Sequence, residues 1–156
     1  MSGTETRLKK WLPHKDIVKN GVLYLRRHYL SPRKWRLPRW FLHLIKRPDV
    51  DRHPHDHPWG FLTLVLKGGY TEEVYHQGKF LYRREVRAGN LLWRPAEHTH
   101  KITHLHVPEV WTLVVAAPAR RTWGFWTEEG EFVPWMKYRE AEDGVSEVWP
   151  EDEVSN

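Results

Sequence analysis

Histidines in two short clusters are the residues of this sequence whose types and spacing could do chemistry. Seven of the eleven histidines in 156 residues make up the clusters, which are His53, His55 and His57, and His98, His100, His104 and His106. Neutral imidazole is the commonest metal ligand among protein side chains. A His-x-His pair on a strand places both rings on one face, because side chains alternate with a period of two. Two such rings and a third from another strand would form a three-ligand site with open positions, as a catalytic metal requires.

Two kinds of residue pattern are absent from the sequence. There is no cysteine, which excludes disulfides, thiolate metal sites and a cysteine nucleophile. There is also no run of about eighteen apolar residues, so we expect no membrane span. The first residues, MSGTETRLKKWLPHKD, lack the apolar stretch of a secretory signal. These absences favour a cytoplasmic protein with no membrane partner.

About ten short, β-prone segments must position the histidines. We expect strands at Val22–Tyr29, Phe41–Lys46, Phe61–Leu66, Tyr70–Tyr75, Phe80–Val86, Asn90–Trp93, Lys101–His106, Trp111–Ala117, Trp123–Trp126 and Phe132–Trp135. Turn residues separate them, such as the pair Gly68 and Gly69. Many short strands, with no amphipathic helix of three turns, predict an all-β sandwich or barrel.

The charge distribution divides the chain into three parts. We expect a basic N-terminal arm at residues 1–19, one β-barrel domain at 20–138 and an acidic, flexible tail at 139–156. Residues 1–52 carry fourteen bases and four acids, a net charge of +10, and the tail carries seven acids and one base, a net −6. The basic half would attract an anion such as a phosphate, a carboxylated substrate or nucleic acid. The alternative is a solvated basic face with the acidic tail folded near it.

The first histidine cluster resembles the first motif of the cupin superfamily. That motif reads Gly, five residues, His-x-His, three or four residues, Glu, six residues, Gly. In this chain His55 and His57 form the pair, Phe61 stands where the motif has Glu, and Gly68 follows after six residues. The opening glycine is replaced by Asp49.

The second cluster resembles the second cupin motif, which reads Gly, five residues, Pro-x-Gly, two residues, His, three residues, Asn. Gly89, Pro95 and His100 stand at these spacings. Glu97 replaces the second glycine and His104 replaces the asparagine. The two motifs occur in the expected order, so the resemblance extends over roughly residues 20–138.

The resemblance implies a fold, a ligand set and a chemistry. The fold would be the cupin double-stranded β-helix, or jelly-roll, barrel. The metal ligands would be His55, His57 and His100, without the usual glutamate, as in the three-histidine cupins that include thiol dioxygenases. The metal would be divalent, with Fe(II) favoured, although imidazole suits Zn, Mn and Ni as well. His104 would face the cavity as a catalytic general acid or base, or as a second-shell donor.

Two local alternatives concern the first cluster. His53 and His55 form a rival His-x-His pair, but the closing position would then be Leu66 or Lys67, neither of which is glycine. Asp56 could accept a hydrogen bond from a ligand imidazole or cap the turn, and we favour the turn.

Several other residues are candidates for substrate binding. An arginine that points into the barrel mouth would bind a carboxylate or phosphate in a bidentate manner. The candidates are Arg26, Arg83, Arg84, Arg87 and Arg94. Tyr70, Tyr75 and Tyr82 could supply a phenol near the metal, although packing is the favoured role of each. The segment 33–40 interleaves bases with tryptophans, a pattern that can bind nucleic acid, although packing against the barrel is favoured.

These observations favour one function and leave a second open. The favoured function is a non-haem Fe(II) oxidoreductase of the dioxygenase type that acts on a small anionic substrate. The alternative is a cupin binding module or isomerase without redox chemistry, for a nucleotide, a sugar phosphate or nucleic acid. A homodimer also remains open as an assembly.

Overall fold

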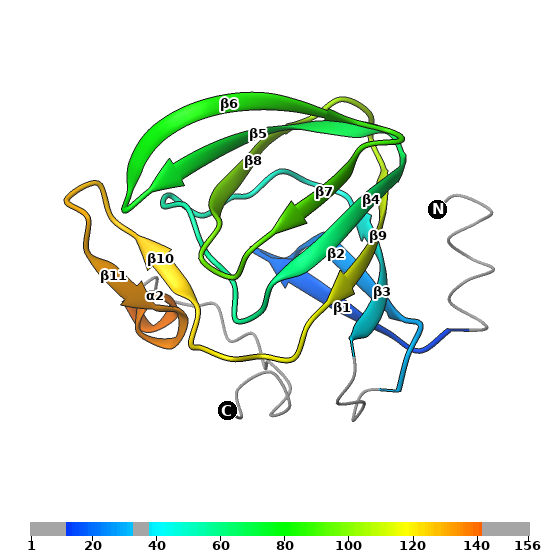
Figure 1. Cartoon of the computed structure of the whole chain (residues 1–156), viewed down its shortest axis with the longest axis horizontal. Coiled ribbons are helices and arrows are strands. Elements are labelled where there is room, and N and C mark those ends of the chain that lie inside the picture. Colours follow the sequence, from blue (N-terminus) through cyan, green and yellow to red (C-terminus); the bar gives the residue numbers. More distant parts are fainter. Residues whose placement is uncertain (1–11, 33–37, 142–156) are drawn as a thin grey trace.

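The structure, a computed structural model, describes residues 12–32 and 38–141 and is nearly all β in that part of the chain. The described residues form eleven strands and one short helix, whose arrangement can be followed in Figure 1. The elements are β1 His14–Lys19, β2 Val22–Tyr29, β3 Arg39–Ile45, β4 Phe61–Lys67, β5 Gly69–His76, β6 Lys79–Arg87, β7 Leu91–Arg94, β8 Thr99–Leu105, β9 Val110–Ala116, β10 Gly124–Trp126, β11 Phe132–Pro134 and α2 Trp135–Ala141. The prediction of an all-β class is confirmed.

The strands form two main antiparallel sheets and one hairpin. The larger sheet has the order β1-β2-β3-β9-β4-β7, the smaller one has the order β6-β5-β8, and β10 pairs with β11. Strand β9 lies between β3 and β4, so strands that are distant in sequence become neighbours. Figure 1 shows the smaller sheet lying over the larger one.

Alternating side chains fill the space between the sheets. Along β4, Phe61, Thr63 and Val65 are buried, whereas Leu62 and Leu64 between them are half-buried. This is the two-residue period of a strand with one buried face. One core cluster joins side chains from both sheets, which are therefore packed face to face. Its buried members are Ile17, Leu25, Ile45, Val65, Tyr70, Val86, Ile102 and Val110.

Two glycines of the cupin-like motifs stand where the backbone needs them. Gly68, between β4 and β5, has φ of 77°, and Gly89, between β6 and β7, has φ of 90°. Residues with a Cβ rarely adopt such angles. A Cβ on Gly68 would also lie 2.5 Å from Cγ2 of Val107. The turn at Gly68 carries the chain from the larger sheet into the smaller one.

Differences from the predicted elements lie at the two ends of the domain. Strand β1 begins at His14, inside the segment 1–19 that we expected to be an arm, and its Asp16 pairs with Arg26 of β2 through a 2.5 Å ion pair. The sequence His14–Lys19 is mostly polar and does not show the pattern of a strand. It forms β1 because it pairs with β2. Helix α2 crosses the expected boundary between the barrel and the tail at 138/139. Residues 1–11 and 142–156, which hold most of the expected arm and tail, lie outside the described residues.

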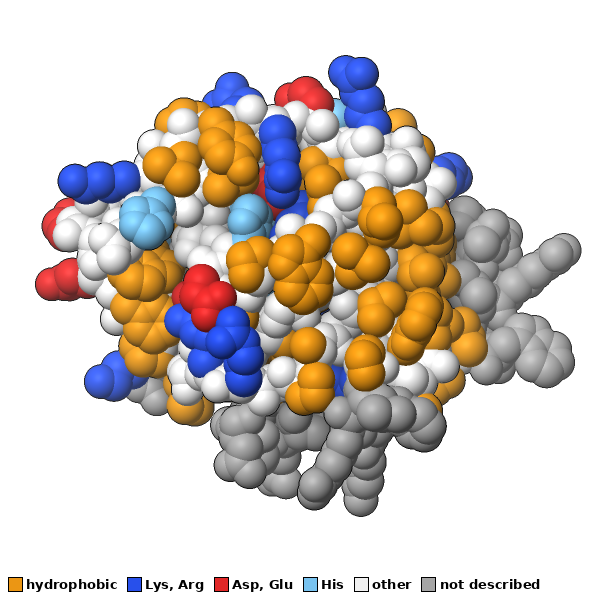
Figure 2. All heavy atoms as spheres, in the orientation of Figure 1, with side chains coloured by type: hydrophobic (Ala, Val, Ile, Leu, Met, Phe, Trp, Pro, Cys, Tyr) orange, Lys and Arg blue, Asp and Glu red, His pale blue; other side chains and the backbone are white. Residues whose placement is uncertain are grey.

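Charged and apolar side chains share the surface. On the face in Figure 2, hydrophobic side chains gather where Figure 1 places β4 and β7. Exposed hydrophobic residues of these strands are Leu66, Leu91 and Trp93. The lysines and arginines of the described residues are scattered over this face. No helix among the described residues has the length and apolarity needed to cross a membrane.

Candidate metal centre

Backbone hydrogen bonds hold the segment before β4 against β8. Asp49 donates its N–H to the carbonyl of Ile102 over 2.8 Å and accepts the N–H of Ile102 on Oδ2 over 2.7 Å. His55 and His100 exchange backbone hydrogen bonds of 3.1 and 3.0 Å, and the N–H of His57 donates to Ala96 over 3.0 Å. The two histidine clusters therefore lie side by side because their backbones are bonded to one another.

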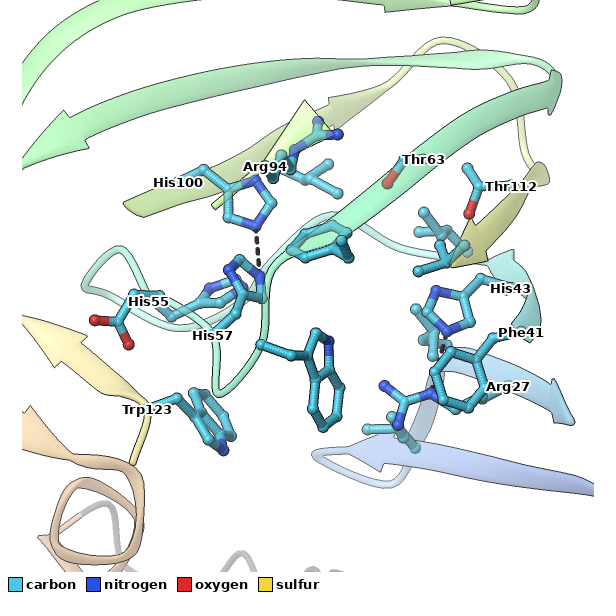
Figure 3. Close-up of a pocket in the computed structure, with 18 of the residues that line it drawn as sticks. Arg27, Phe41, His43, His55, His57, Thr63, Arg94, His100, Thr112 and Trp123 are labelled. Carbon is cyan, nitrogen blue, oxygen red and sulfur yellow. Dashed lines mark hydrogen bonds between the residues drawn. The ribbon is translucent and has the colours of Figure 1, made fainter. Parts of the chain in front are cut away.

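The rings of His55, His57 and His100 converge. One ring nitrogen from each lies within 4.8 Å of the others. The Nε2 atoms of His57 and His100 are 3.2 Å apart, and Figure 3 shows the three rings turned toward one another. Two nitrogens bound at about 2.1 Å to one metal, at right angles, would lie about 3 Å apart. The separation observed in the protein fits a shared divalent metal.

Glu72 on β5 fixes the orientation of His100. Its Oε1 atom forms a very short hydrogen bond with Nδ1 of His100. Because Nδ1–H donates to this carboxylate, the lone pair of the imidazole is left on Nε2, which faces His57. Metal-binding histidines in proteins commonly donate their other N–H to a carboxylate in this way. The donor set and its support therefore both fit a metal.

A second group of potential ligands is less suited to a cation. Glu72, His98 and His100 also offer atoms within 4.8 Å of one another. Glu72, however, already accepts hydrogen bonds from Arg84 over 2.6 Å and from Arg94 over 2.8 Å. A cation bound to this carboxylate would lie beside two guanidinium groups and be repelled. We therefore assign Glu72 to the support of His100.

The electrostatic state of the site follows from burial. Burial lowers the pKa of His100 to about 4, although Glu72 acts in the opposite direction. Burial and the neighbouring His100 lower the pKa of His57 well below its usual value. Burial of Glu72 would raise its pKa, but the hydrogen bond from His100 and the charge of Arg94 hold that pKa far below its usual range. Neutral imidazoles beside an ionised carboxylate are the forms that metal binding requires.

The three rings open into a cavity of about 180 Å³ between the sheets. Its wall near the rings includes Phe61, whose ring centroid lies 4.6 Å from that of His57. Phe61 stands at the glutamate position of the first motif and offers no ligand atom. Arg94 and Tyr70 line the same cavity.

Comparison with protein-family models and with curated proteins finds no match for the sequence. Among solved structures, a cupin-2 domain from Rhodospirillum rubrum superposes with a TM-score of 0.58 at 13% identity, over 76% of this chain and 78% of that one. This chain has the cupin fold.

Two other solved structures share this cupin fold. The polyketide cyclase RemF from Streptomyces resistomycificus superposes with a TM-score of 0.58 at 18% identity, over 85% of this chain and 89% of that one. Fe(II)-HppE gives a TM-score of 0.55 at 13% identity over 69% of this chain, which spans only 56% of the HppE length. At these identities the likeness establishes the fold alone.

His104 is not brought to the cupin cavity. The pairing of β5 with β8 shifts register, so that Glu72 lies opposite Ile102 but Thr71 lies opposite His104. The extra residue between Ile102 and His104 is a β-bulge, which reverses the faces that follow it. His104 is therefore exposed, and its ring lies 6.0 Å from that of His106. Its position does not support the catalytic role that the cupin resemblance implied for it.

Residues His53 and Asp56 also have structural partners. His53 Nδ1 lies 3.0 Å from the Tyr138 hydroxyl and belongs to neither group of potential ligands. Asp56 accepts hydrogen bonds from the Gly124 N–H over 2.9 Å and from Trp126 Nε1 over 3.2 Å. Asp56 therefore anchors β10 against the histidine segment and does not orient an imidazole.

Of the five candidate arginines, only Arg94 lines the cavity. Arg26 is buried against Asp16, and Arg83 and Arg84 pair with Glu73 and Glu72. Arg87 is exposed on β6.

Sequence reasoning missed the carboxylate that supports His100 and a pair of residues that line the cavity. Glu72 was not singled out, although it shares a strand face with Tyr70 and Val74. An acidic residue on an otherwise apolar strand face indicates a buried carboxylate that needs a partner. Arg27 and His43, which also line the cavity, were not singled out either. Only the pairing of β2 with β3 brings them together.

Proposed function

We propose that this cupin is a metal-dependent oxidoreductase in which His55, His57 and His100 hold Fe(II) and a small anionic substrate is oxidised by dioxygen. The observation that carries the proposal is the convergence of three imidazoles on one cavity, with His100 oriented by Glu72. The shared fold of Fe(II)-HppE supports the choice of iron. When bound, the iron would supply the redox chemistry with dioxygen and a Lewis-acid centre.

The ligand set leaves room for the reaction. Three neutral imidazoles add no negative charge, so the full divalent charge would remain to polarise the substrate. Phe61 contributes no fourth protein ligand at the position where a glutamate is common. Its ring and Val114 of the same apolar cluster give this part of the cavity an apolar wall, and an apolar wall that excludes water strengthens electrostatic interactions.

Arg94 would orient the reacting end of the substrate. Its side chain is only 1% exposed, and its Nε and Nη2 atoms donate to Glu72 and Tyr70. Its Nη1 atom is buried without a hydrogen-bond partner among the described residues. An unmet buried donor is costly, and a carboxylate or similar anion of the substrate would satisfy it beside the metal ligands.

Oxygen uptake tests the proposal. Protein purified without oxygen and loaded with Fe(II) is mixed with a panel of small carboxylates, thiols and phosphonates in an oxygen electrode. We expect at least one compound to cause oxygen uptake that requires iron and is lost in His57→Ala, while the exposed control His76→Ala retains it. Iron binding without uptake for any compound would contradict the oxidoreductase assignment.

A reaction without redox chemistry is the second candidate. RemF, a polyketide cyclase, shares the fold over 85% of this chain, and the same three imidazoles could hold a Lewis-acid metal such as Zn. Nucleic-acid binding is less favoured, because Arg26, Arg27 and Arg39 of the basic half are buried. Turnover with Zn in the absence of oxygen would favour this second candidate.

A further inference from the structure

Two rows of apolar side chains cross the outer face of the larger sheet, which points away from the cavity. Each row takes one residue from each of the neighbouring strands β3, β9, β4 and β7, and strand pairing places these residues directly opposite one another. The eight residues, which we call the outer apolar face, are in row order Trp40, Val115, Leu62 and Trp93, and Leu42, Leu113, Leu64 and Leu91.

The outer apolar face departs from the pattern of a sheet that has one face in water. An antiparallel sheet that packs on a core with one face and meets water with the other alternates apolar and polar residues. On β4, however, the buried Phe61 and Val65 alternate with Leu62, Leu64 and Leu66. All eight residues of the outer apolar face are likewise apolar. The sequence of these strands therefore suits burial on both sides of the sheet.

A large part of this face is nevertheless exposed along β4 and β7. Trp93 is 64% exposed, Leu91 60% and Leu66, at the end of β4, 48%, and Figure 2 shows hydrophobic side chains gathered in this region. With about 150–250 Å² for a whole aromatic side chain, the face offers on the order of 600 Å² of accessible apolar surface. A patch of this size could form the apolar centre of a stable interface, to which each partner contributes about 800 Å².

The backbone at Gly60 leaves room for the indole of Trp93. A Cβ on Gly60 would lie 3.0 Å from Cη2 and 3.2 Å from Cζ2 of that ring. The indole therefore rests against the chain just before β4, although most of its surface is exposed. An aromatic side chain that is restrained before binding loses little conformational entropy on binding, and such residues often carry much of the binding energy at protein interfaces.

The absence of charge limits the kinds of partner that the outer apolar face could bind. A site for a membrane surface or for nucleic acid carries lysines or arginines among its other residues, whereas these eight residues include none. A second copy of this chain presents the same uncharged face, and a two-fold axis brings the two faces together with no other surface required. The contact would be one sheet packed on another, as in the interior of the protein.

We propose that two copies of this chain form a two-fold symmetric dimer in which their outer apolar faces pack against each other, with Trp93 of each copy at the contact. The dimer goes beyond the proposed function and does not depend on it. The candidate metal ligands lie on the other side of the larger sheet, so the dimer should form without metal.

The first experiment measures the mass of the full-length, metal-free protein by sedimentation equilibrium between about 1 and 100 μM. We expect a mass equal to two chains. Leu91→Glu would bury an unpaired carboxylate from each copy at the contact, so the dissociation constant should rise by about a hundredfold or more. The matched control is Leu81→Glu, which adds the same charge at a leucine of β6 that is 55% exposed and lies outside the outer apolar face.

The control should form the dimer as the wild type does. A wild type that is monomeric over the whole concentration range would overturn the proposal, as would equal dissociation constants for Leu91→Glu and the wild type. Loss of the dimer in both leucine variants would place the contact elsewhere and would overturn the proposal as well.

A second variant tests the same contact without an added charge. Trp93→Ala removes the restrained indole, so the dissociation constant should rise by about thirtyfold. Trp93→Phe keeps an aromatic ring and should retain part of the affinity. Circular dichroism of each variant should match that of the wild type, because the replaced side chain is largely exposed. A dissociation constant unchanged by Trp93→Ala would overturn the proposed contact.

Flotation with lipid vesicles tests a membrane surface as the other kind of partner. The vesicles hold phosphatidylcholine alone or phosphatidylcholine with phosphatidylserine. We expect the wild type to remain unbound, because the dimer would cover the outer apolar face. Binding by the wild type that is lost in Leu91→Glu and kept in Leu81→Glu would show that the face contacts lipid, and would overturn the dimer.

Discussion

Glu72 and His100 share a hydrogen bond between Oε1 and Nδ1, and this contact decides which nitrogen of His100 is left for a metal. The two residues stand 28 positions apart and meet because β5 pairs with β8. Arg84 and Arg94 hold the carboxylate from its other sides. The orientation of one candidate metal ligand therefore depends on a buried network that extends beyond the three histidines themselves.

Replacing Glu72 should weaken metal binding. Glu72→Gln keeps the shape of the side chain but removes the charge that orients His100, so the affinity for Co(II) should fall by about tenfold. The matched control is Glu73→Gln, the next residue along β5, which pairs with Arg83. Competition titrations with a chelator give both affinities. Equal Co(II) affinities in Glu72→Gln and the wild type would show that the contact does not support the ligand.

Introducing a glutamate at Phe61 should add a ligand. The Phe61 ring lies beside that of His57, at the glutamate position of the first motif. Phe61→Glu should therefore tighten Co(II) binding and reduce any activity that requires an open coordination position. Phe61→Gln is the control for size and polarity and should not tighten binding. Co(II) affinity unchanged by Phe61→Glu would mean that this position points away from the site.

Protonation of His43 should make stability depend on pH. The pKa of His43 is lowered in the folded protein by burial, Arg27 and His28, whereas it is about 6.5 in the unfolded chain. Between these values the unfolded chain binds a proton that the folded protein does not. The stabilisation is therefore complete above about pH 6.5 and is lost as the pH falls toward the lowered value, by up to about 1.4 kcal/mol per pH unit.

Urea unfolding of the metal-free protein between about pH 7 and pH 5 measures this dependence. His43→Gln keeps an acceptor for Arg27 but removes the titrating group, so the free energy of unfolding should vary less with pH than in the wild type. The exposed control His76→Gln should keep the wild-type slope. A wild-type slope in His43→Gln would rule out His43 as the source.

Much of the fold follows from local patterns in the sequence, and the parts that do not are set by strand pairing. Strand β2 was predicted with its bounds, Val22–Tyr29, because apolar and aromatic residues make up five of its eight positions. Strand β1 was missed because its lysines and histidine interrupt the alternation of apolar and polar residues. It forms a strand because it pairs with β2.

The candidate site also has parts that local sequence patterns predict and parts that only strand pairing sets. Motif spacing brought together His55, His57 and His100, whose ring nitrogens converge in the structure, although their role as ligands stays a prediction until metal is measured. The outward position of His104 depends on a bulge that has no local signal. The meeting of Arg27 and His43 depends on register between strands, which no single segment specifies.

The metal content of purified variants tests the central claim most directly. Wild-type protein loaded with Co(II) or Fe(II) and freed of excess ions should hold about one metal per chain. His57→Ala and His100→Ala should each lose most of that metal, because two imidazoles alone bind weakly. His76→Ala, altered on the exposed end of β5, should hold as much as the wild type. Undiminished metal in His100→Ala would contradict the assignment of the metal centre.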